Sequence, residues 1–172
     1  MNTVNRHIAQ TNEYLIAEMG RGSLKDLIEV SGDQAAQPES VSAPLNPACF
    51  VCGEENPHGL HLGFQTEDRR AFARWTPCVG SESYKGVIHG GIISSVLDEA
   101  MSKAIISGGD EAFTADLRIR FRRKICVGDV VLVNGWVVSV EKRRIQAEAS
   151  IMSEEGEERA HAWGVFLVAR HF

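Results

Sequence analysis

The chain has 172 residues, of which 44% are hydrophobic and 24% are charged, and its net charge is −5. This composition is ordinary for a globular protein, and the length suits one domain with a sizeable core. The acidic net charge argues against a general nucleic-acid binder. Membrane insertion is not expected either, because no window reaches the roughly 18 apolar residues of a membrane span.

The first twenty residues, MNTVNRHIAQTNEYLIAEMG, lack the charged start, apolar run and cleavage site of a secretory signal. We therefore expect a cytoplasmic protein that binds neither membranes nor nucleic acid. The chain has 4 cysteines, and in the cytoplasm they should be reduced, so a disulfide framework is not expected.

The sequence changes character near residue 49. Residues 5–30 carry apolar residues at near-helical spacing and predict one helix or two short ones. Residues 31–48 are rich in small residues and proline, which is typical of a surface linker. We therefore assign residues 1–48 to an N-terminal helical extension with a linker, and residues 49–172 to the folded domain.

From Cys49 onward, short runs alternate apolar and polar residues, which is strand patterning. The runs cover residues 59–68, 69–77, 113–125, 129–143, 145–153 and 158–170. Between the second and third runs, the mostly apolar segment GVIHGGIISSVLDEAMSKAI predicts a helix over about residues 90–105. Because the loops between the late strands are too short for parallel crossovers, we predict an α+β fold in which an antiparallel sheet of five or six strands encloses this helix.

The predicted helix carries one stripe of small and polar residues, while apolar residues cover most of its remaining circumference. At 100° per residue, the stripe contains Gly91, Ser94, Ser95, Asp98 and Ser102. A solvent-facing stripe would normally carry Lys, Glu or Gln. Glycines at the helix start leave backbone N–H groups accessible to an oxyanion. The pattern therefore predicts an oxyanion hole near the helix start, and a merely solvated stripe is the alternative.

The spacing of Gly91 and Asp98 constrains how they can act together. They lie seven residues apart in the sequence, which is about 10 Å along a helix. Both cannot contact one carbonyl group at that separation. If they act together, Asp98 must come from a second subunit, so the sequence predicts a symmetric dimer with two sites at its interface.

The segment HGGIISSVLDEA, residues 89–100, resembles the hotdog-fold thioesterases of the phenylacetate-degradation (PaaI-like) type. In that family, His-Gly-Gly is followed by Asp or Glu nine residues after the histidine. The resemblance covers roughly residues 49–172. It implies a long central helix wrapped by a curved antiparallel sheet, assembly as a homodimer or a dimer of dimers, and hydrolysis of acyl-CoA without a cofactor.

The same resemblance implies roles for individual residues. Asp98 is the carboxylate that acts as general base or nucleophile, and Gly90 donates the oxyanion hydrogen bond. Ser102 and Thr114 match a hydroxyl one turn after the carboxylate and a hydroxyl at the start of the next strand. His89 orients the loop or contacts the thioester, with a helix-capping role as the alternative.

One position departs from the family pattern. Many relatives carry Asn or Gln six residues before the histidine, and this chain has Ser83 there. We expect Ser83 and Gly91 to contact the substrate. The shorter side chain keeps a second function open, a catalytically weak acyl-CoA binding or sensing module. A hydratase of the same fold would carry histidine where this chain has Lys103.

The run RIRFRRK, residues 118–124, is a local basic patch. Strand alternation places Arg118, Arg120 and Arg122 on one face. Arginines near the mouth of a site would suit the phosphate groups of coenzyme A. We therefore predict phosphate contacts for Arg120, Arg122 and Arg123, and a solvated sheet face is the alternative.

The segment CFVCGEENPHGLHLGF offers four candidate zinc ligands, Cys49, Cys52, His58 and His61. A second Cys-x-x-Cys pair is missing from the sequence, and His61 would alternate with strand residues. The strand-to-helix context of a thioredoxin-type redox pair is missing too. We therefore predict a tight turn with partly buried cysteines and no metal.

Overall fold

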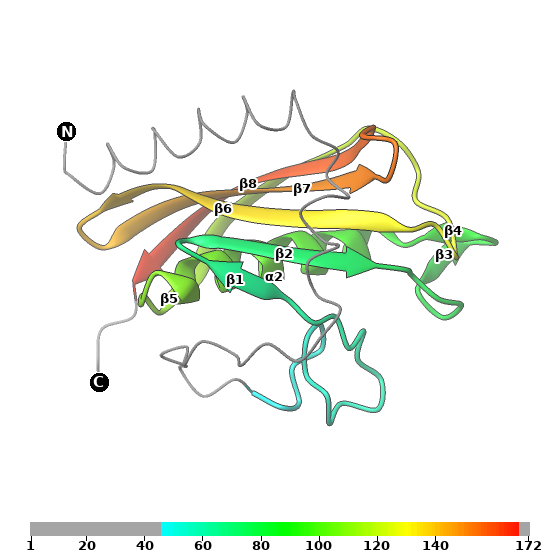
Figure 1. Ribbon diagram of the computed structural model, residues 1–172, viewed down its shortest axis with the longest axis horizontal. Coiled ribbons are helices and arrows are strands. Elements are labelled where there is room, and N and C mark those ends of the chain that lie inside the picture. Colours follow the sequence, from blue (N-terminus) through cyan, green and yellow to red (C-terminus); the bar gives the residue numbers. More distant parts are fainter. Residues whose placement is uncertain (1–45, 169–172) are drawn as a thin grey trace, which may run out of the picture.

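The computed structural model describes residues 46–168 (Figure 1). The predicted helical extension and most of the linker, residues 1–45, lie outside the described residues. The elements are β1 (Gln65–Glu67), β2 (Arg70–Trp75), β3 (Glu82–Tyr84), β4 (Val87–Ile88), α2 (Gly90–Ser107), β5 (Ala112–Phe121), β6 (Val131–Glu141), β7 (Arg144–Ser153) and β8 (Glu158–Val168). Within residues 46–168, no helix is both long enough and apolar enough to cross a membrane.

Six strands form one antiparallel sheet in the order β1-β2-β6-β7-β8-β5. The helix α2 packs along one face of this sheet (Figure 1). The predicted α+β architecture, with one long helix and six antiparallel strands, is confirmed. Strand β5 is at the end of the strand order, so its outer edge has no partner strand among the described residues.

Small residues on the inner face of the sheet let α2 lie close to the strands. A Cβ atom added to Gly135 on β6 would lie 2.3 Å from the Ala100 carbonyl oxygen. A Cβ atom on Gly164 of β8 would meet the Met101 sulfur at 3.0 Å. The inner positions of β7 and β8 carry buried alanines, namely Ala147, Ala149, Ala160 and Ala162. Leu97 and Met101 of α2 fill this surface and are fully buried, which stabilises the fold by about 1.5–3 kcal/mol each.

Two stretches differ from the prediction. Residues 59–64, which were expected to be part of a strand, form a loop in which the Leu60 and Leu62 N–H groups donate to the Phe50 and Val51 carbonyls at 2.8 Å. The apolar alternation there reflects two leucines that pack onto the core rather than a sheet face. The short hairpin of β3 and β4 was not predicted, because strands of two or three residues leave almost no alternation in the sequence.

Candidate active site

The start of α2 is capped by His89. The Nδ1 atom of His89 accepts the Gly91 N–H at 2.8 Å, and its backbone carbonyl accepts the N–H groups of Ile92 and Ile93 at 3.0 and 3.2 Å. The Gly90 N–H has no hydrogen-bond partner within residues 46–168. The free backbone donor of the first turn is therefore that of Gly90, while the Gly91 donor is engaged by the cap.

An aromatic ring lies beside the Gly90 donor. A Cβ atom on Gly90 would lie 3.6 Å from Cζ of Phe121, at the end of β5, and nothing else outside the helix comes within 4 Å. Phe121 is 52% exposed. Phe121 is therefore an apolar neighbour of Gly90 at the start of α2.

Asp98 is held by a hydroxyl from the neighbouring strand. The Thr114 hydroxyl donates to Asp98 Oδ1 at 2.8 Å, and the β5–β8 register shifts directly after Thr114. Burial raises the pKa of Asp98, the Thr114 hydrogen bond lowers it, and the charge of Glu99 raises it further. The net effect is a raised pKa, which makes the Asp98 carboxylate a stronger base than an ordinary aspartate.

The other polar residues of the stripe serve different purposes. The Ser94 and Ser95 hydroxyls donate to the Gly90 and Gly91 carbonyls of their own helix, at 2.8 and 3.0 Å. Ser102, one turn beyond Asp98, lines a cavity of about 210 Å³ together with Ile105, Ile106, Glu111, Ala112 and Phe113. The cavity is mostly apolar and lies beside the position of Thr114 on β5.

The Gly90 donor and the Asp98 carboxylate do not meet within one chain. They lie eight residues apart on a continuous helix, which corresponds to about 12 Å along its axis. A carbonyl group is far smaller than this distance. Within one chain, the Gly90 donor and the Asp98 carboxylate are therefore two separate groups on one helix.

Ser83 lies on the exposed side of the β3–β4 hairpin. The hairpin is attached to the start of α2, because the His89 N–H donates to the Ser81 carbonyl at 2.8 Å. The Ser83 side chain makes no hydrogen bond within the described part of the chain. The structure thus brings the hairpin to the helix start, but it does not place Ser83 against Gly90, whose nearest outside neighbour is Phe121.

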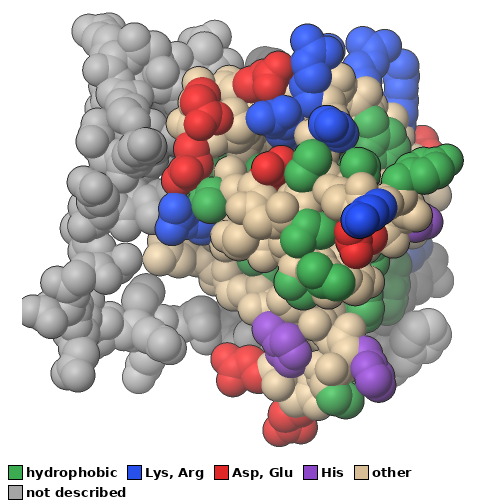
Figure 2. Space-filling model, turned by 90° about the vertical axis from the view of Figure 1, so that its right-hand side faces the viewer, with side chains coloured by type: hydrophobic (Ala, Val, Ile, Leu, Met, Phe, Trp, Pro, Cys, Tyr) green, Lys and Arg blue, Asp and Glu red, His purple; other side chains and the backbone are tan. Residues whose placement is uncertain are grey.

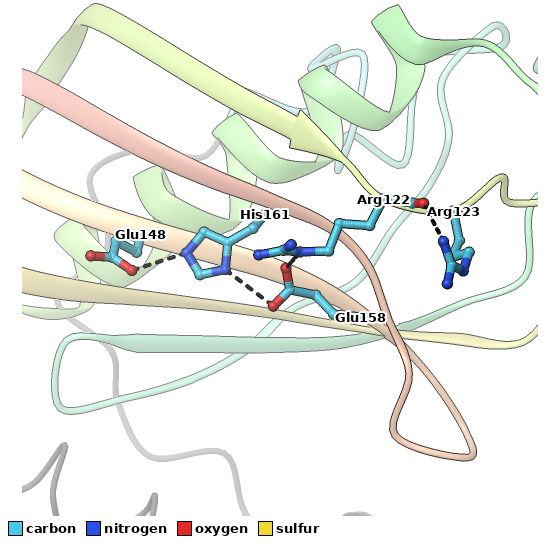
Figure 3. A network of polar contacts seen from close by, with 5 residues as sticks. All are labelled: Arg122, Arg123, Glu148, Glu158 and His161. Carbon is cyan, nitrogen blue, oxygen red and sulfur yellow. Dashed lines mark hydrogen bonds and ion pairs between the residues drawn. The ribbon is translucent and has the colours of Figure 1, made fainter.

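The three arginines of the predicted phosphate site differ in their pairing. Arg122 pairs with Glu158 (Figure 3), and Arg123 Nε lies 3.0 Å from Glu157 Oε1. Arg120 is exposed and has no ion pair within residues 46–168. On the face shown in Figure 2, Lys and Arg side chains gather near the top. Of these three arginines, Arg120 is therefore the one whose charge is most available to a bound phosphate group.

A second polar network lies on the face of the sheet away from α2 (Figure 3). His161 Nε2 lies 3.0 Å from Glu148 Oε2, and His161 Nδ1 lies 3.6 Å from Glu158 Oε2. The Trp163 ring stacks at 4.4 Å from the His161 ring, and the Arg118 guanidinium lies 5.6 Å from the Trp163 ring centre. This network is separated from Asp98 by the sheet.

The predicted tight turn with partly buried cysteines is confirmed, and it touches α2. Cys49 Sγ donates to Glu99 Oε2 at 3.9 Å. Burial, together with the hydrogen bond to Glu99 and its charge, raises the pKa of Cys52 to about 12. A thiol held protonated is a poor nucleophile, so Cys52 is not arranged for redox attack.

The sequence analysis did not predict the partners of Glu99, the carboxylate next to Asp98. Lys103 Nζ lies 3.5 Å from Glu99 Oε1, and this pair could have been found from its four-residue spacing on the helix. The contact with Cys49 joins residues 50 positions apart, and no local pattern signals it. His58 and His61 are close to the cysteines in the sequence, but both are exposed. Neither belongs to the cluster formed by Cys49, Cys52 and Glu99.

Residues 85–160 match the family model described as thioesterase superfamily. Mouse acyl-coenzyme A thioesterase THEM5 is 27% identical over 105 residues, which cover 60% of this chain and 42% of that protein. The matched part thus spans about two-fifths of the length of this curated relative.

Solved structures show the same fold. A hypothetical thioesterase from Streptococcus pneumoniae, solved with coenzyme A, has a TM-score of 0.61 at 20% identity, covering 63% of this chain and 85% of its own. The Escherichia coli PaaI protein from the phenylacetic acid degradation operon also has a TM-score of 0.61 at 20% identity, with coverages of 64% and 81%. The chain therefore has the predicted hotdog fold, and its residues 85–160 match the thioesterase superfamily.

Proposed function

We propose that the chain hydrolyses acyl-CoA thioesters to a free acid and coenzyme A. The observation that carries this proposal is the Asp98 carboxylate with its raised pKa, held by Thr114 on the polar stripe of the central helix in a thioesterase-superfamily domain. The capped helix start, with its free Gly90 N–H, supports it as a second, separate observation.

Thioester chemistry suits such a sparse site. A thiol leaving group with a pKa near 8.5 departs as a thiolate without a strong general acid. In the proposed reaction, the Gly90 N–H polarises the thioester carbonyl. Asp98 takes a proton from water while the water oxygen attacks the carbonyl carbon, or the Asp98 carboxylate attacks that carbon itself. The C–S bond then breaks, and coenzyme A leaves as a thiolate with the electron pair. After direct attack the acyl group remains on Asp98 as a mixed anhydride, which water hydrolyses to the free acid.

A structural relative adds support for the Asp98–Thr114 pair. The Streptococcus pneumoniae protein that was solved with coenzyme A was also solved with an Asp→Ala substitution and with a Thr→Ala substitution. These two positions are sixteen residues apart, the same separation as that of Asp98 and Thr114. We infer that the pair in this chain belongs to the reacting part of the site.

We further propose that a complete site forms between two subunits. The separation of about 12 Å between Gly90 and Asp98 along the helix is bridged if Gly90 of one chain faces Asp98 of another. The ten-residue strand β5 offers an open edge, and Phe113 on it is 73% exposed. A long, open edge with exposed apolar residues favours pairing with a second copy.

The phosphate groups of coenzyme A are the proposed partners of the basic residues near the end of β5. Arg120 is the first candidate because its charge is uncommitted among the described residues. Arg122 and Arg123 would have to share their guanidinium groups with Glu158 and Glu157. Their contribution to substrate binding is therefore proposed to be smaller than that of Arg120.

A second candidate function is an acyl-CoA binding or sensing module with little catalysis. Ser83 supports this alternative, because its short, exposed side chain makes no hydrogen bond among residues 46–168 and reaches less far than Asn or Gln. Both candidate functions predict that the chain binds acyl-CoA, but only the thioesterase function predicts that the chain hydrolyses it.

A panel of acyl-CoA esters, assayed by release of free thiol, tests the proposal. The wild type is expected to release coenzyme A from at least one ester, and Asp98→Asn is expected to bind that ester with little turnover. Calorimetry supplies the binding measurement for both proteins. If the wild type binds acyl-CoA but releases thiol no faster than Asp98→Asn on every ester, the binding module is the correct function.

A further inference from the structure

A cluster of metal-ligand side chains joins the turn at residues 49–53 to the middle of α2. One sulfur from each of Cys49 and Cys52 and one carboxylate oxygen of Glu99 all lie within 4.8 Å of one another. We propose that these three side chains bind one divalent metal ion of the zinc type. The site is separate from the proposed acyl-CoA reaction, which uses neighbouring Asp98 and requires no metal.

The distances between the donors suit a tetrahedral ion. Zinc lies about 2.3 Å from sulfur and about 2.0–2.2 Å from oxygen, so two tetrahedral donors are on the order of 3.5–3.8 Å apart. Cys49 Sγ and Glu99 Oε2 are 3.9 Å apart. Shifts of a few tenths of an ångström to about 1 Å, within reach of side-chain rotation, would bring all three donors to one ion. The fourth position remains for water or another group.

The backbone of the turn is built tightly around Cys49. The Gly53 N–H donates to the Cys49 carbonyl at 3.0 Å. A Cβ atom at position 53 would lie 2.4 Å from the Cys49 nitrogen and 2.4 Å from the Pro47 carbonyl oxygen. Only glycine fits there. The turn therefore holds Cys49 and Cys52 in a compact loop with two residues between them, the spacing at which paired cysteines bind zinc.

Glu99 is oriented from its far side by a buried lysine. Lys103 is 8% exposed, and its Nζ lies 3.5 Å from Glu99 Oε1. The other oxygen, Oε2, faces Cys49. A partner that holds the outer oxygen of a ligating carboxylate is a usual feature of metal sites. Two thiolates, one carboxylate, one divalent cation and Lys103 also sum to zero charge, which favours burial of the group.

Metal binding would attach the loop of residues 46–64 to α2. Each cysteine loses its S–H proton to solvent when its sulfur bonds the ion, and no oxidant or reductant is involved. Because the ion would bind the folded arrangement and not the unfolded chain, it would also stabilise the domain. Removal of the ion by a chelator should therefore lower the melting temperature of the metal-loaded protein.

Cobalt(II) titration of the full, reduced chain tests the proposal without an activity assay. The wild type should bind one cobalt ion per chain and show a thiolate-to-cobalt charge-transfer band together with the visible bands of tetrahedral cobalt. Zinc should displace the cobalt. If neither band develops in the wild type, the metal site does not exist.

Matched variants assign the ligands. Cys49→Ser and Cys52→Ser should each lose about half of the charge-transfer intensity or all of it, and Glu99→Gln should weaken cobalt binding at least about tenfold. Cys78→Ser is the control, because Cys78 is an exposed free cysteine outside the cluster. Unchanged cobalt spectra and affinity in Glu99→Gln would overturn the role of Glu99. Loss of the band in Cys78→Ser would overturn the whole assignment.

Discussion

The start and the middle of α2 supply two different kinds of chemical group. At the start, the backbone N–H of Gly90 is left free because the His89 side chain takes the next donor, that of Gly91. In the middle, the Asp98 side chain is held from β5 by Thr114. In the proposed reaction, the first group acts through main-chain geometry and the second through a side chain and its pKa. The difference means that each group can be removed by a different substitution, with the other group left intact.

The largest effect on kcat is expected from removing the Asp98 carboxylate. Asp98→Asn keeps the size of the residue and its ability to accept the Thr114 hydrogen bond, but it removes the basic oxygen. We expect kcat for a good acyl-CoA substrate to fall about 10²–10⁴-fold, the range for losing a general base. Binding of the substrate, measured by calorimetry, should persist.

The matched control is the adjacent carboxylate. Glu99 faces Cys49 and Lys103 rather than Thr114, so Glu99→Gln should leave kcat within a few-fold of wild type, an effect well below that of losing a general base. A dead Glu99→Gln protein beside an active Asp98→Asn protein would show that the catalytic carboxylate has been assigned to the wrong residue.

The backbone N–H of Gly90 can be removed by replacing this residue with proline. Gly90 is the first residue of α2, a position where proline is compatible with the helix and lacks only the N–H in question. His89 is already extended, with φ −65° and ψ 132°, as a residue before proline prefers. Gly90→Pro should lower kcat about 10²–10³-fold, the effect of losing one oxyanion donor.

Gly90→Ala is the control for that substitution. It keeps the N–H, and its Cβ would meet Phe121 at 3.6 Å, an ordinary contact. Its kcat should stay close to that of wild type, and circular dichroism should show the same helix content in both variants. Equal losses of kcat in the alanine and proline variants would point to crowding by Phe121 rather than to the donor.

A smaller effect is expected at the phosphate end of the substrate. Arg120→Met should raise KM for acyl-CoA about fivefold, which corresponds to losing roughly 1 kcal/mol of charged contact. KM for a pantetheine thioester, which lacks the nucleotide, should not change. A rise of equal size for both substrates would contradict phosphate recognition by Arg120.

The smallest effect is a displacement of the pH profile. The Thr114 hydrogen bond lowers the pKa of Asp98, against burial, which raises it. Thr114→Val removes the lowering contribution, so the pKa should rise further. Protonation then inactivates the base at a higher pH, and the acid limb of kcat/KM should move to higher pH. Thr114→Ser, which keeps the hydroxyl, should leave the limb in place. A shift to lower pH in Thr114→Val would contradict this coupling.

The elements of the sheet and helix were largely predictable because they carry strong periodic signals. The helix was expected at about 90–105 and is Gly90–Ser107. The long strands β5 to β8 match the predicted runs, except that β5 and β7 each begin one residue earlier than predicted. The loop at residues 59–64 could not be distinguished from a strand, because the partly buried Leu60 and the buried Leu62, two positions apart, give the same pattern in both.

The site was predictable only where its parts are local. The polar stripe and the spacing from His89 to Asp98 are visible in the sequence, and so is the hydroxyl at Thr114. The position of Phe121 beside Gly90 depends on how the end of β5 meets the helix start. The contact of Cys49 with Glu99 depends on a loop folding back over 50 residues. Contacts of this kind arise from tertiary packing and leave no local signature.

The most direct test of the proposed two-chain site is a heterodimer that carries one defect in each chain. Asp98→Asn and Gly90→Pro chains are co-expressed with different tags, and the mixed species is isolated over both affinity columns. If the two halves of a site come from different subunits, one of the two sites in this heterodimer is intact, and its kcat per dimer should be about half that of wild type. A heterodimer as inactive as either parent, or a failure of the two chains to associate, would contradict the account.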